Sequence, residues 1–216
     1  MLLLYGAAKV GKTKALEDLP NCLIIDTEKG TRAISGMKVE VNSLSELMAL
    51  MKELKKDENK GVYQYVALDT IDNVVMWIER HIISTNPKAD GTLPKSIADM
   101  PYGGGWSQTR DKTLDVIKAL GELTDALIII AHRDRKIIGE SSVEVATTNL
   151  DLPGKLRNQL MAAVDATGYV YRKDGELRVS FVREEGDDQI EAGSRIAHLT
   201  NTDIDLDWTK IYKQAL

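Results

Sequence analysis

The chain contains a single cysteine and no excess of positive charge. Cys22 has no partner for an internal disulfide, and its place at the start of the apolar run Cys-Leu-Ile-Ile predicts a buried thiol. The 28 Lys and Arg residues are outnumbered by 33 Asp and Glu residues, which gives a net charge of −5. The protein as a whole therefore does not attract nucleic acid, and a contact with DNA or RNA requires local basic patches.

No apolar stretch is long enough to span a bilayer, and the first residues lack the charged leader and the cleavage site of a signal peptide. Internal repeats, low-complexity tracts and linkers rich in Pro and Gly are absent as well. The 216 residues, 43% hydrophobic and 28% charged, are typical of one α/β domain with its own core. We therefore expect one cytoplasmic domain over residues 1–216, with no membrane partner.

Apolar runs and amphipathic segments alternate along the chain, which predicts an α/β fold. The predicted strands are residues 2–5, 21–26, 38–41 (a short edge strand), 63–68 and 126–131, followed by a hairpin of residues 169–172 and 178–182. The predicted helices are residues 12–19, 43–56, 71–83, 106–120, 153–164 and a C-terminal helix from 206 or 207 to 216. Continuous apolar runs are typical of strands buried on both faces, so we expect a doubly wound, mostly parallel sheet with an antiparallel C-terminal hairpin.

The clearest motif is Gly-Ala-Ala-Lys-Val-Gly-Lys-Thr at residues 6–13, which matches the phosphate-binding pattern G-x-x-x-x-G-K-[ST]. It lies between a predicted strand and a predicted helix, whose N-terminus adds partial positive charge. Lys12 would reach the β- and γ-phosphates, and the Thr13 hydroxyl would bind Mg²⁺. The alternative is a strand–helix turn without a ligand. We expect nucleotide contacts from Gly6, Ala7, Ala8, Lys9, Val10, Gly11, Lys12, Thr13 and Lys14.

Acidic residues follow two of the predicted strands. Asp69 ends an apolar strand and is expected to hold Mg²⁺ mostly through its water shell, the alternative being a helix cap. Glu28 follows the second strand at the edge where open α/β sheets bind ligands, so it is the candidate general base that orients water toward the γ-phosphate. Asp26 competes for this role, and either side chain could instead be solvated in the loop.

His132 follows the predicted strand of residues 126–131 at the same sheet edge. A polar residue there can detect the γ-phosphate and move the loop behind it, although a satisfied histidine at a strand end fits equally well. Together these positions predict Lys12, Glu28 and His132 as catalytic residues, with Thr13 and Asp69 at the metal.

The ordered set of residues 6–13, Asp26-Thr27-Glu28, Leu68-Asp69-Thr70 and Ala131-His132 resembles the core of RecA-like ATPases. It looks most like small phage proteins of single-strand annealing or recombination, and residues 195–199 and 207–212 are similar to the C-terminal end of that family. The resemblance implies ATP hydrolysis with Mg²⁺, Glu28 as the catalytic glutamate and the sheet order 2-3-4-1-5. It also implies action on single-stranded DNA, in the host cytoplasm if a phage encodes the protein.

The resemblance further implies two mobile loops that face DNA, at residues 86–110 and 133–156. Binding a single strand needs cations for the phosphates and flat side chains for the bases. Tyr102 and Trp106 could instead pack on the core, and single basic residues are usually surface charges. The DNA-binding candidates are Lys95, Trp106 and Arg110 in the first loop and Arg133, Arg135, Lys136, Lys155 and Arg157 in the second.

RecA-like ATPases often complete the site with a cation from a neighbouring subunit, for which Arg172 and Lys173 are the candidates. Partners implied by the resemblance are a second copy of the chain and a single-strand-binding or other recombination protein. Only five residues precede Gly6, so RecA's N-terminal route to filaments is not expected, and rings, other interfaces or a monomer stay open.

Two other functions remain open. One is a nucleotide-gated module that binds a protein partner and no DNA. The other is a P-loop small-molecule kinase, with residues 133–136 as its basic lid. The position of Glu28 speaks against the kinase, because transfer to an acceptor must exclude an activated water.

Overall fold

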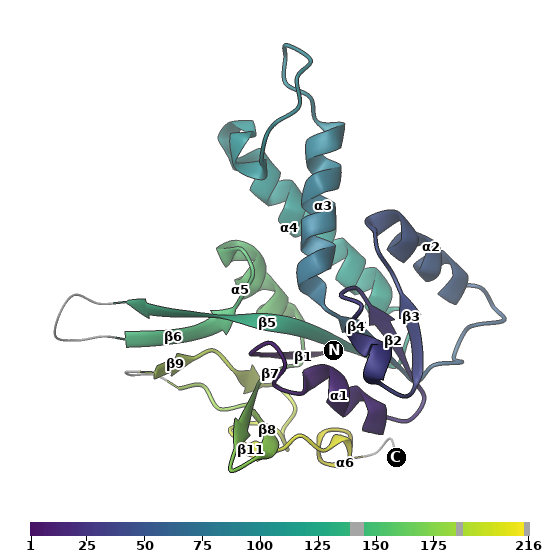
Figure 1. Cartoon of the computed structure of the whole chain (residues 1–216), viewed down its shortest axis with the longest axis vertical. Coiled ribbons are helices and arrows are strands. Elements are labelled where there is room, and N and C mark those ends of the chain that lie inside the picture. Colours follow the sequence, from purple (N-terminus) through teal and green to yellow (C-terminus); the bar gives the residue numbers. More distant parts are fainter. Residues whose placement is uncertain (139–144, 185–187, 214–216) are drawn as a thin grey trace.

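The structure is a computed structural model that describes residues 1–138, 145–184 and 188–213. Its centre is a sheet whose main strands are parallel, with helices on both faces (Figure 1). The parallel strands are β1 (Leu2–Gly6), β2 (Cys22–Asp26), β3 (Met37–Glu40), β4 (Tyr65–Asp69), β5 (Ala126–Ile138) and β7 (Ala166–Lys173). Beyond β7 follow two antiparallel strands, β8 (Glu176–Ser180) and β11 (Asp203–Asp205).

The strands lie side by side in the order β11-β8-β7-β1-β5-β4-β2-β3. Counted in chain order without the edge strand β3, the five parallel strands stand as 2-3-4-1-5, so the predicted sheet order is confirmed. The predicted hairpin is also confirmed, although its first strand begins earlier, at Ala166, and pairs in parallel with β1. The hairpin is thus part of the central sheet.

Helices cover the sheet in two layers. One face carries α2 (Leu44–Leu54), α3 (Ile71–Thr85), α4 (Gly104–Gly121) and α5 (Gly154–Ala163). The other carries α1 (Lys12–Ala15), which continues as the 3-10 turn Leu16–Asp18, and α6 (Trp208–Ile211). Among the described helices, none combines the length and the apolar composition that crossing a bilayer requires.

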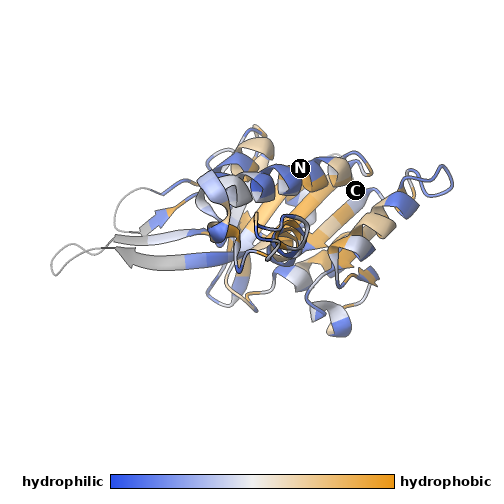
Figure 2. Ribbon diagram, turned by 90° about the horizontal axis from the view of Figure 1, so that it is seen from above, coloured by the Kyte–Doolittle hydropathy of each residue, from blue (hydrophilic) through white to orange (hydrophobic). Residues whose placement is uncertain are grey.

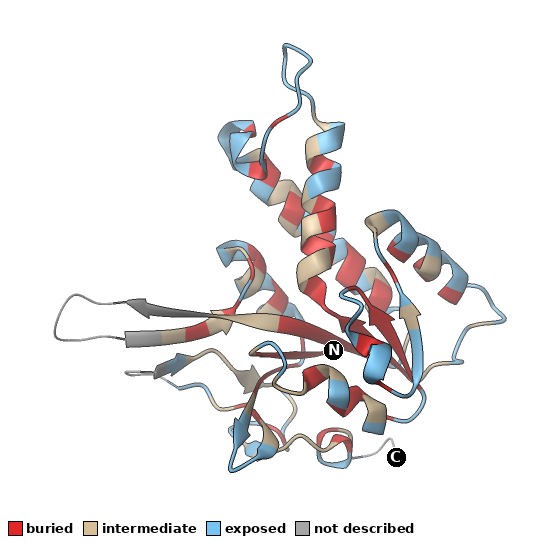
Figure 3. Ribbon diagram, viewed as in Figure 1, coloured by how far each residue is buried: buried red, intermediate tan, exposed pale blue. Residues whose placement is uncertain are grey.

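Alternate side chains of each apolar strand enter different layers, which is why the runs are continuous. In β1, Leu3 and Tyr5 pack toward α2–α5, whereas Leu2 and Leu4 pack toward α1 and α6. Strands β1, β2 and β4 and the first part of β5 form the apolar band between the helices (Figure 2) and are buried (Figure 3). Cys22 lies in this core as a free thiol, and burial raises its pKa to about 12.

The loop predicted at residues 133–156 is wrong over residues 133–138 and 145–150, which form strands. Strand β5 continues seven residues beyond Ala131 and pairs with β6 (Val145–Leu150) in an antiparallel ribbon that extends away from the sheet (Figure 1). Beyond the sheet edge β5 has no parallel neighbour, so its backbone groups pair with β6 instead. Short strand β9 (Asp188–Ile190) adds to β6, and β10 (Gly193–Ser194) pairs with β7.

Helix boundaries differ from the predictions at three places. Helix α6 is a single turn that begins after Asp207, whose carboxylate accepts a hydrogen bond from the Thr209 N–H, and residues 214–216 lie outside the described residues. Pro153 caps α5 rather than starting it. The first predicted loop contains the 3-10 turns Ile97–Asp99 and Pro101–Gly103 and the first turns of α4. The connection from α3 to α4 is largely exposed (Figure 3).

Candidate functional site

The phosphate loop curls around the ammonium group of Lys12. Lys12 begins α1, is 5% exposed, and donates hydrogen bonds of 2.9 Å to the carbonyl oxygens of Gly6 and Ala7. A Cβ atom on Gly6 would lie 2.3 Å from the carbonyl oxygen of Val170, and Gly11 has φ +123°. Both glycines are therefore required by the backbone, and the loop encloses a positive charge at a helix N-terminus, as a phosphate cradle does.

The outer residues of the loop differ from its interior. Ala8 and Lys9 are exposed, and Lys9 adopts a left-handed conformation with φ 61°. The ammonium group of Lys14 forms an ion pair with Glu17, so the structure does not bring this side chain to Lys12. Of the predicted nucleotide-binding lysines, only Lys12 has its side chain inside the loop.

Asp69 lies beside the loop at the end of β4 and is 4% exposed. Burial raises the pKa of Asp69, and the pKa lies at about 6. A hydrogen bond from the Thr13 side chain lowers this pKa, whereas the charges of Glu28 and Asp26 raise it further. Burial also lowers the pKa of Lys12, which Asp69 counters. A buried carboxylate among other acids is stabilised by a cation, so the Asp69–Thr13 pair fits Mg²⁺.

A Mg²⁺ ion at this pair would take its remaining ligands from phosphates and water, as Mg²⁺ commonly does. Among the described residues, no group of three or more His, Cys, Asp or Glu side chains could hold a metal ion. The donors that do fit are one hydroxyl and one carboxylate, Thr13 and Asp69, which matches ions that arrive with a nucleotide.

The two acids after β2 have different surroundings. Asp26 is 1% exposed and accepts hydrogen bonds from the N–H groups of Glu28 (2.9 Å), Gly30 (3.2 Å) and Thr31 (2.9 Å) and from the Thr31 hydroxyl (2.6 Å). Burial raises the pKa of Asp26, but these hydrogen bonds outweigh it and hold the pKa below its usual value. Asp26 therefore builds the loop, and the Glu28 side chain, 37% exposed, is the accessible carboxylate.

Thr27 joins this loop to the end of β4. Its hydroxyl accepts from the N–H of Thr70 (2.8 Å) and donates to the carbonyl oxygen of Thr70 (3.0 Å), while Asn73 donates to the Thr27 carbonyl (2.9 Å). The Thr70 hydroxyl donates to Glu28 at 3.1 Å. Glu28 and the metal-side residue Asp69 are thus held in one hydrogen-bonded frame.

His132 lies between two carboxylates. Its Nδ1 atom is 3.6 Å from Oε1 of Glu28 and 3.5 Å from Oδ2 of Asp72, and its backbone N–H donates to the same Asp72 oxygen at 3.3 Å. The hydrogen bond to Asp72 raises the pKa of His132, with further increases from the charges of Asp72 and Glu28, against lowering by burial. We call the set of Lys12, Thr13, Glu28, Asp69, Asp72 and His132 the nucleotide edge.

Asp72 was missed by the sequence reasoning. It stands three residues after Asp69, in the first turn of α3, where an acid is ordinary because it favours the positive end of a helix. In the sequence, Asp72 could have been found only from its spacing of three residues from Asp69, which places both acids on the sheet edge that also carries His132.

Arg172 reaches the phosphate loop of its own chain. Its Nε atom donates to the carbonyl oxygen of Val10 at 3.0 Å, and Nη1 donates to the carbonyl oxygen of Gly175 at 2.7 Å. Lys173 is exposed at the hairpin turn. In this conformation Arg172 is a contact within the chain rather than a cation extended toward a neighbour.

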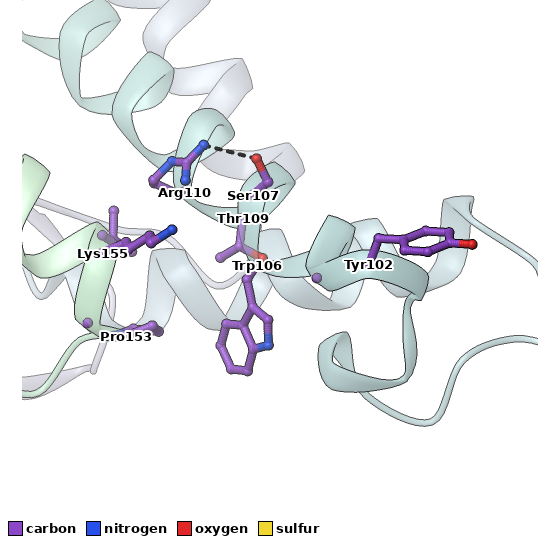
Figure 4. Close-up of a pocket in the computed structure, with 10 residues that line it drawn as sticks. Tyr102, Trp106, Ser107, Thr109, Arg110, Pro153 and Lys155 are labelled. Carbon is purple, nitrogen blue, oxygen red and sulfur yellow. Dashed lines mark hydrogen bonds between the residues drawn. The ribbon is translucent and has the colours of Figure 1, made fainter.

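A second site lies between the start of α4 and the start of α5 (Figure 4). It is a cleft of about 640 Å³ lined by Tyr102, Gly103, Trp106, Ser107, Thr109, Arg110, Pro153, Gly154, Lys155 and Leu156. We call it the aromatic cleft. It brings Trp106 and Arg110 from the first predicted DNA loop together with Lys155 from the second. Trp106 is 46% exposed and Tyr102 fully exposed, so packing on the core is wrong for Tyr102.

Of the other DNA-binding candidates, those whose side chains the structure describes do not line the aromatic cleft. Arg133 donates to the hydroxyl of Tyr169 at 2.6 Å, and Arg157 lies 3.8 Å from the Glu191 carboxylate. Lys95 is exposed beside the turn that leads into α4. Arg135 and Lys136 lie on β5, with side chains outside the described part of the structure. The structure therefore unites three of the eight candidates.

The fold and the phosphate loop define a P-loop NTPase. Residues 1–202 match the model of a family described as AAA domain, so the chain belongs to this family of P-loop ATPases, whose members generally bind ATP with Mg²⁺. It is also 26% identical over 136 residues to the SPbeta prophage-derived uncharacterized protein YorG of Bacillus subtilis strain 168. The match covers 61% of this chain and 40% of YorG, so the chain spans less than half of that relative.

Proposed function

We propose that this protein binds and hydrolyses ATP with Mg²⁺ and acts on single-stranded DNA in phage-type recombination, annealing or repair. The aromatic cleft carries the DNA part of the proposal, because Trp106, Arg110 and Lys155 from distant segments meet there. The prophage origin of YorG supports the phage setting. The order of the sheet strands and the resemblance to RecA-like ATPases support the coupling of both activities.

Each residue of the nucleotide edge has a role in the proposed hydrolysis. Lys12 leaves the carbonyl oxygens of Gly6 and Ala7 and binds the phosphates, while Thr13 and Asp69 hold Mg²⁺. When bound, Mg²⁺ neutralises charge that develops on the phosphate oxygens. Lys12, Thr13 and Asp69 therefore bind the nucleotide and its metal ion in this proposal.

Glu28 is the base that orients the attacking water in this proposal. Its carboxylate is accessible, and the Thr70 hydroxyl fixes one of its oxygens at 3.1 Å, leaving the other for water. The carboxylate oxygens of Asp26 are occupied by hydrogen bonds within the loop, which favours Glu28 over its competitor. His132 faces Glu28 from the end of the parallel part of β5 and is placed to respond to the γ-phosphate.

The aromatic cleft has the two components that a single strand requires. Trp106 offers a half-exposed ring for stacking, and Lys155 and Arg110 offer cations for phosphates. Arg110 donates to the hydroxyl of Ser107 at 2.9 Å (Figure 4) and forms an ion pair with the exposed carboxylate of Asp111 at 2.8 Å, so a DNA phosphate would share this guanidinium group with Asp111. Base stacking is tolerant of sequence, so we expect little sequence preference.

The kinase alternative has weaker support. The segment expected to form its basic lid lies within strand β5, and Arg133 is hydrogen-bonded to Tyr169 instead of reaching over the phosphates. The nucleotide-gated module differs from the proposal in having no DNA ligand. An experiment with DNA therefore separates it from the proposed function.

The test is ATP turnover measured with and without single-stranded oligothymidylate at low salt. We expect stimulation by DNA that weakens as salt increases, because phosphate contacts release counterions. Tryptophan fluorescence gives a direct binding signal: Trp77 and Trp208 are buried, so quenching by DNA reports mainly Trp106. If ATP is hydrolysed but DNA neither binds nor stimulates, the DNA part is wrong. Capture of a protein partner with ATP but not ADP would then favour the module.

A further inference from the structure

We infer that Asp72 is a positioning residue for the proposed hydrolysis: it holds the His132 ring as a cation facing Glu28, so that the chain itself supplies positive charge at the phosphate end of the site. The inference rests on the proposed function. It adds a residue that the sequence pattern of the phosphate loop does not contain, and it gives His132 a charged rather than a neutral role.

One oxygen of Asp72 contacts both the backbone N–H (3.3 Å) and the ring Nδ1 (3.5 Å) of His132, so a single carboxylate fixes the end of the strand and the orientation of the ring. Asp72 itself is fixed in the first turn of α3, directly after the frame of Thr27 and Thr70. The ring is therefore held from a rigid element.

His132 pairs in register with Gly6, the first residue of the phosphate loop, on the neighbouring strand β1. Its Nδ1 atom lies 3.6 Å from the Glu28 carboxylate. A charge on this ring thus acts on the phosphate loop and on the candidate base at the same time.

Charged groups from three parts of the chain act on the His132 ring. Asp72 faces it from α3 and Glu28 from the loop after β2, and both carboxylates favour the protonated ring. Lys12 on α1 opposes them, as does partial burial, yet the pKa of His132 stays above its usual value because the hydrogen bond to Asp72 is the largest contribution. The neighbouring Arg133 is turned toward the Tyr169 hydroxyl.

The inference predicts a pH dependence. Because the pKa of His132 is raised, the ring stays protonated to higher pH than an unperturbed histidine, and turnover falls on the alkaline side as the pH passes this pKa. Removing the Asp72 charge lowers the pKa of His132 and moves this fall to lower pH. At pH values above the pKa of His132, on the alkaline limb of the pH profile, each unit by which the pKa is lowered reduces turnover about tenfold.

The experiment compares the wild type with Asp72→Asn, which keeps the size of the side chain and its ability to accept the backbone hydrogen bond. The imidazole signals of His81, His132 and His198 are titrated by NMR in the protein without nucleotide, with His132→Gln to assign the signal. We expect a lower pKa for His132 only. In ATP turnover we expect the alkaline limb to move to lower pH, with KM for ATP little changed and kcat near the wild-type value at pH values below both alkaline limbs.

The matched control is Glu79→Gln, a half-buried acid on the same helix α3, which should leave both the His132 titration and the pH profile unchanged. In the His132→Gln background, Asp72→Asn should have no further effect on kcat, because the two residues act as one unit.

Three outcomes overturn the inference. If the His132 titration is unchanged in Asp72→Asn, Asp72 does not set the pKa of the ring. If the titration shifts but the pH profile of turnover does not, the charge of His132 does not control turnover, and Asp72 has a structural role. A further fall in kcat in the His132→Gln background would show that Asp72 acts by another route. Absence of ATP turnover in the wild type would instead overturn the proposed function. The two failures are distinguishable because the NMR titration of His132 is measured without ATP.

Discussion

The nucleotide edge and the aromatic cleft differ in how their side chains are held. Lys12 and Asp69 are about 5% and 4% exposed, and the His132 ring contacts both Glu28 and Asp72. In the aromatic cleft, Trp106 is half-exposed and Tyr102 fully exposed. Preformed, buried contacts suit a ligand of fixed shape, whereas exposed rings beside cations suit a variable polymer.

The activities of the two regions can therefore be changed independently by substitution. The nucleotide edge is built on the ends of β1, β2, β4 and β5, while the aromatic cleft is built on the starts of α4 and α5. A substitution in one region should therefore change one activity and leave the other measurable. Three variants, Glu28→Gln, Trp106→Ala and Arg172→Ala, test this separation.

Glu28→Gln should reduce kcat for ATP about 10²–10⁴-fold, because the amide keeps the hydrogen bond from Thr70 but cannot act as a base. ATP affinity and DNA-induced quenching of Trp106 should stay near wild type. Turnover, nucleotide affinity and fluorescence titration measure the three quantities. The matched control is Glu40→Gln, an exposed acid at the end of β3 on the same sheet edge. Unchanged turnover in Glu28→Gln would remove Glu28 from the role of base.

The nucleotide edge was largely predictable because its residues follow from local patterns. The glycines of the phosphate loop, Asp69 and Glu28 all stand directly after apolar runs, and parallel strands align such positions at one edge. Asp72 could not be predicted because an acid in the first turn of a helix is common, and only the packing of α3 against β5 brings it to His132.

The aromatic cleft was only partly predictable. Its residues come from segments about 45 positions apart, and their meeting depends on how α4 and α5 lie on the sheet. The β5–β6 ribbon was missed for a similar reason. Its polar residues carry no apolar alternation, so only the antiparallel pairing of Arg133 with Leu150 onward reveals it.

Trp106→Ala should weaken single-stranded DNA binding by about 1–3 kcal/mol, the range for the loss of one stacked base. ATP turnover without DNA should be unchanged, because the ring lies outside the nucleotide edge. Anisotropy of a labelled oligothymidylate measures the affinity. The control is Leu93→Ala, an exposed apolar residue in the same connection that does not line the aromatic cleft. Equal loss in both variants would mean that the cleft is not the DNA site.

The smallest expected effect concerns Arg172, which the resemblance assigns to a neighbouring subunit and the structure holds against its own phosphate loop. If this contact within the chain is the functional one, Arg172→Ala loses the support of the Val10 carbonyl and binds ADP roughly fivefold more weakly, the effect of about one net hydrogen bond. The change should be independent of protein concentration, and Lys173→Ala, at the exposed turn, should show none.

A cation that acts on a neighbour gives the opposite pattern for the same variant. ADP affinity would be retained, kcat would fall, and mixing with Glu28→Gln protein would restore turnover, because each variant supplies what the other lacks at a shared interface. ADP affinity by isothermal titration and turnover of the mixture therefore decide between the two roles. The result also decides where the β7–β8 hairpin belongs. Weaker ADP binding places the hairpin in the nucleotide edge, whereas complementation assigns it to an interface between copies of the chain.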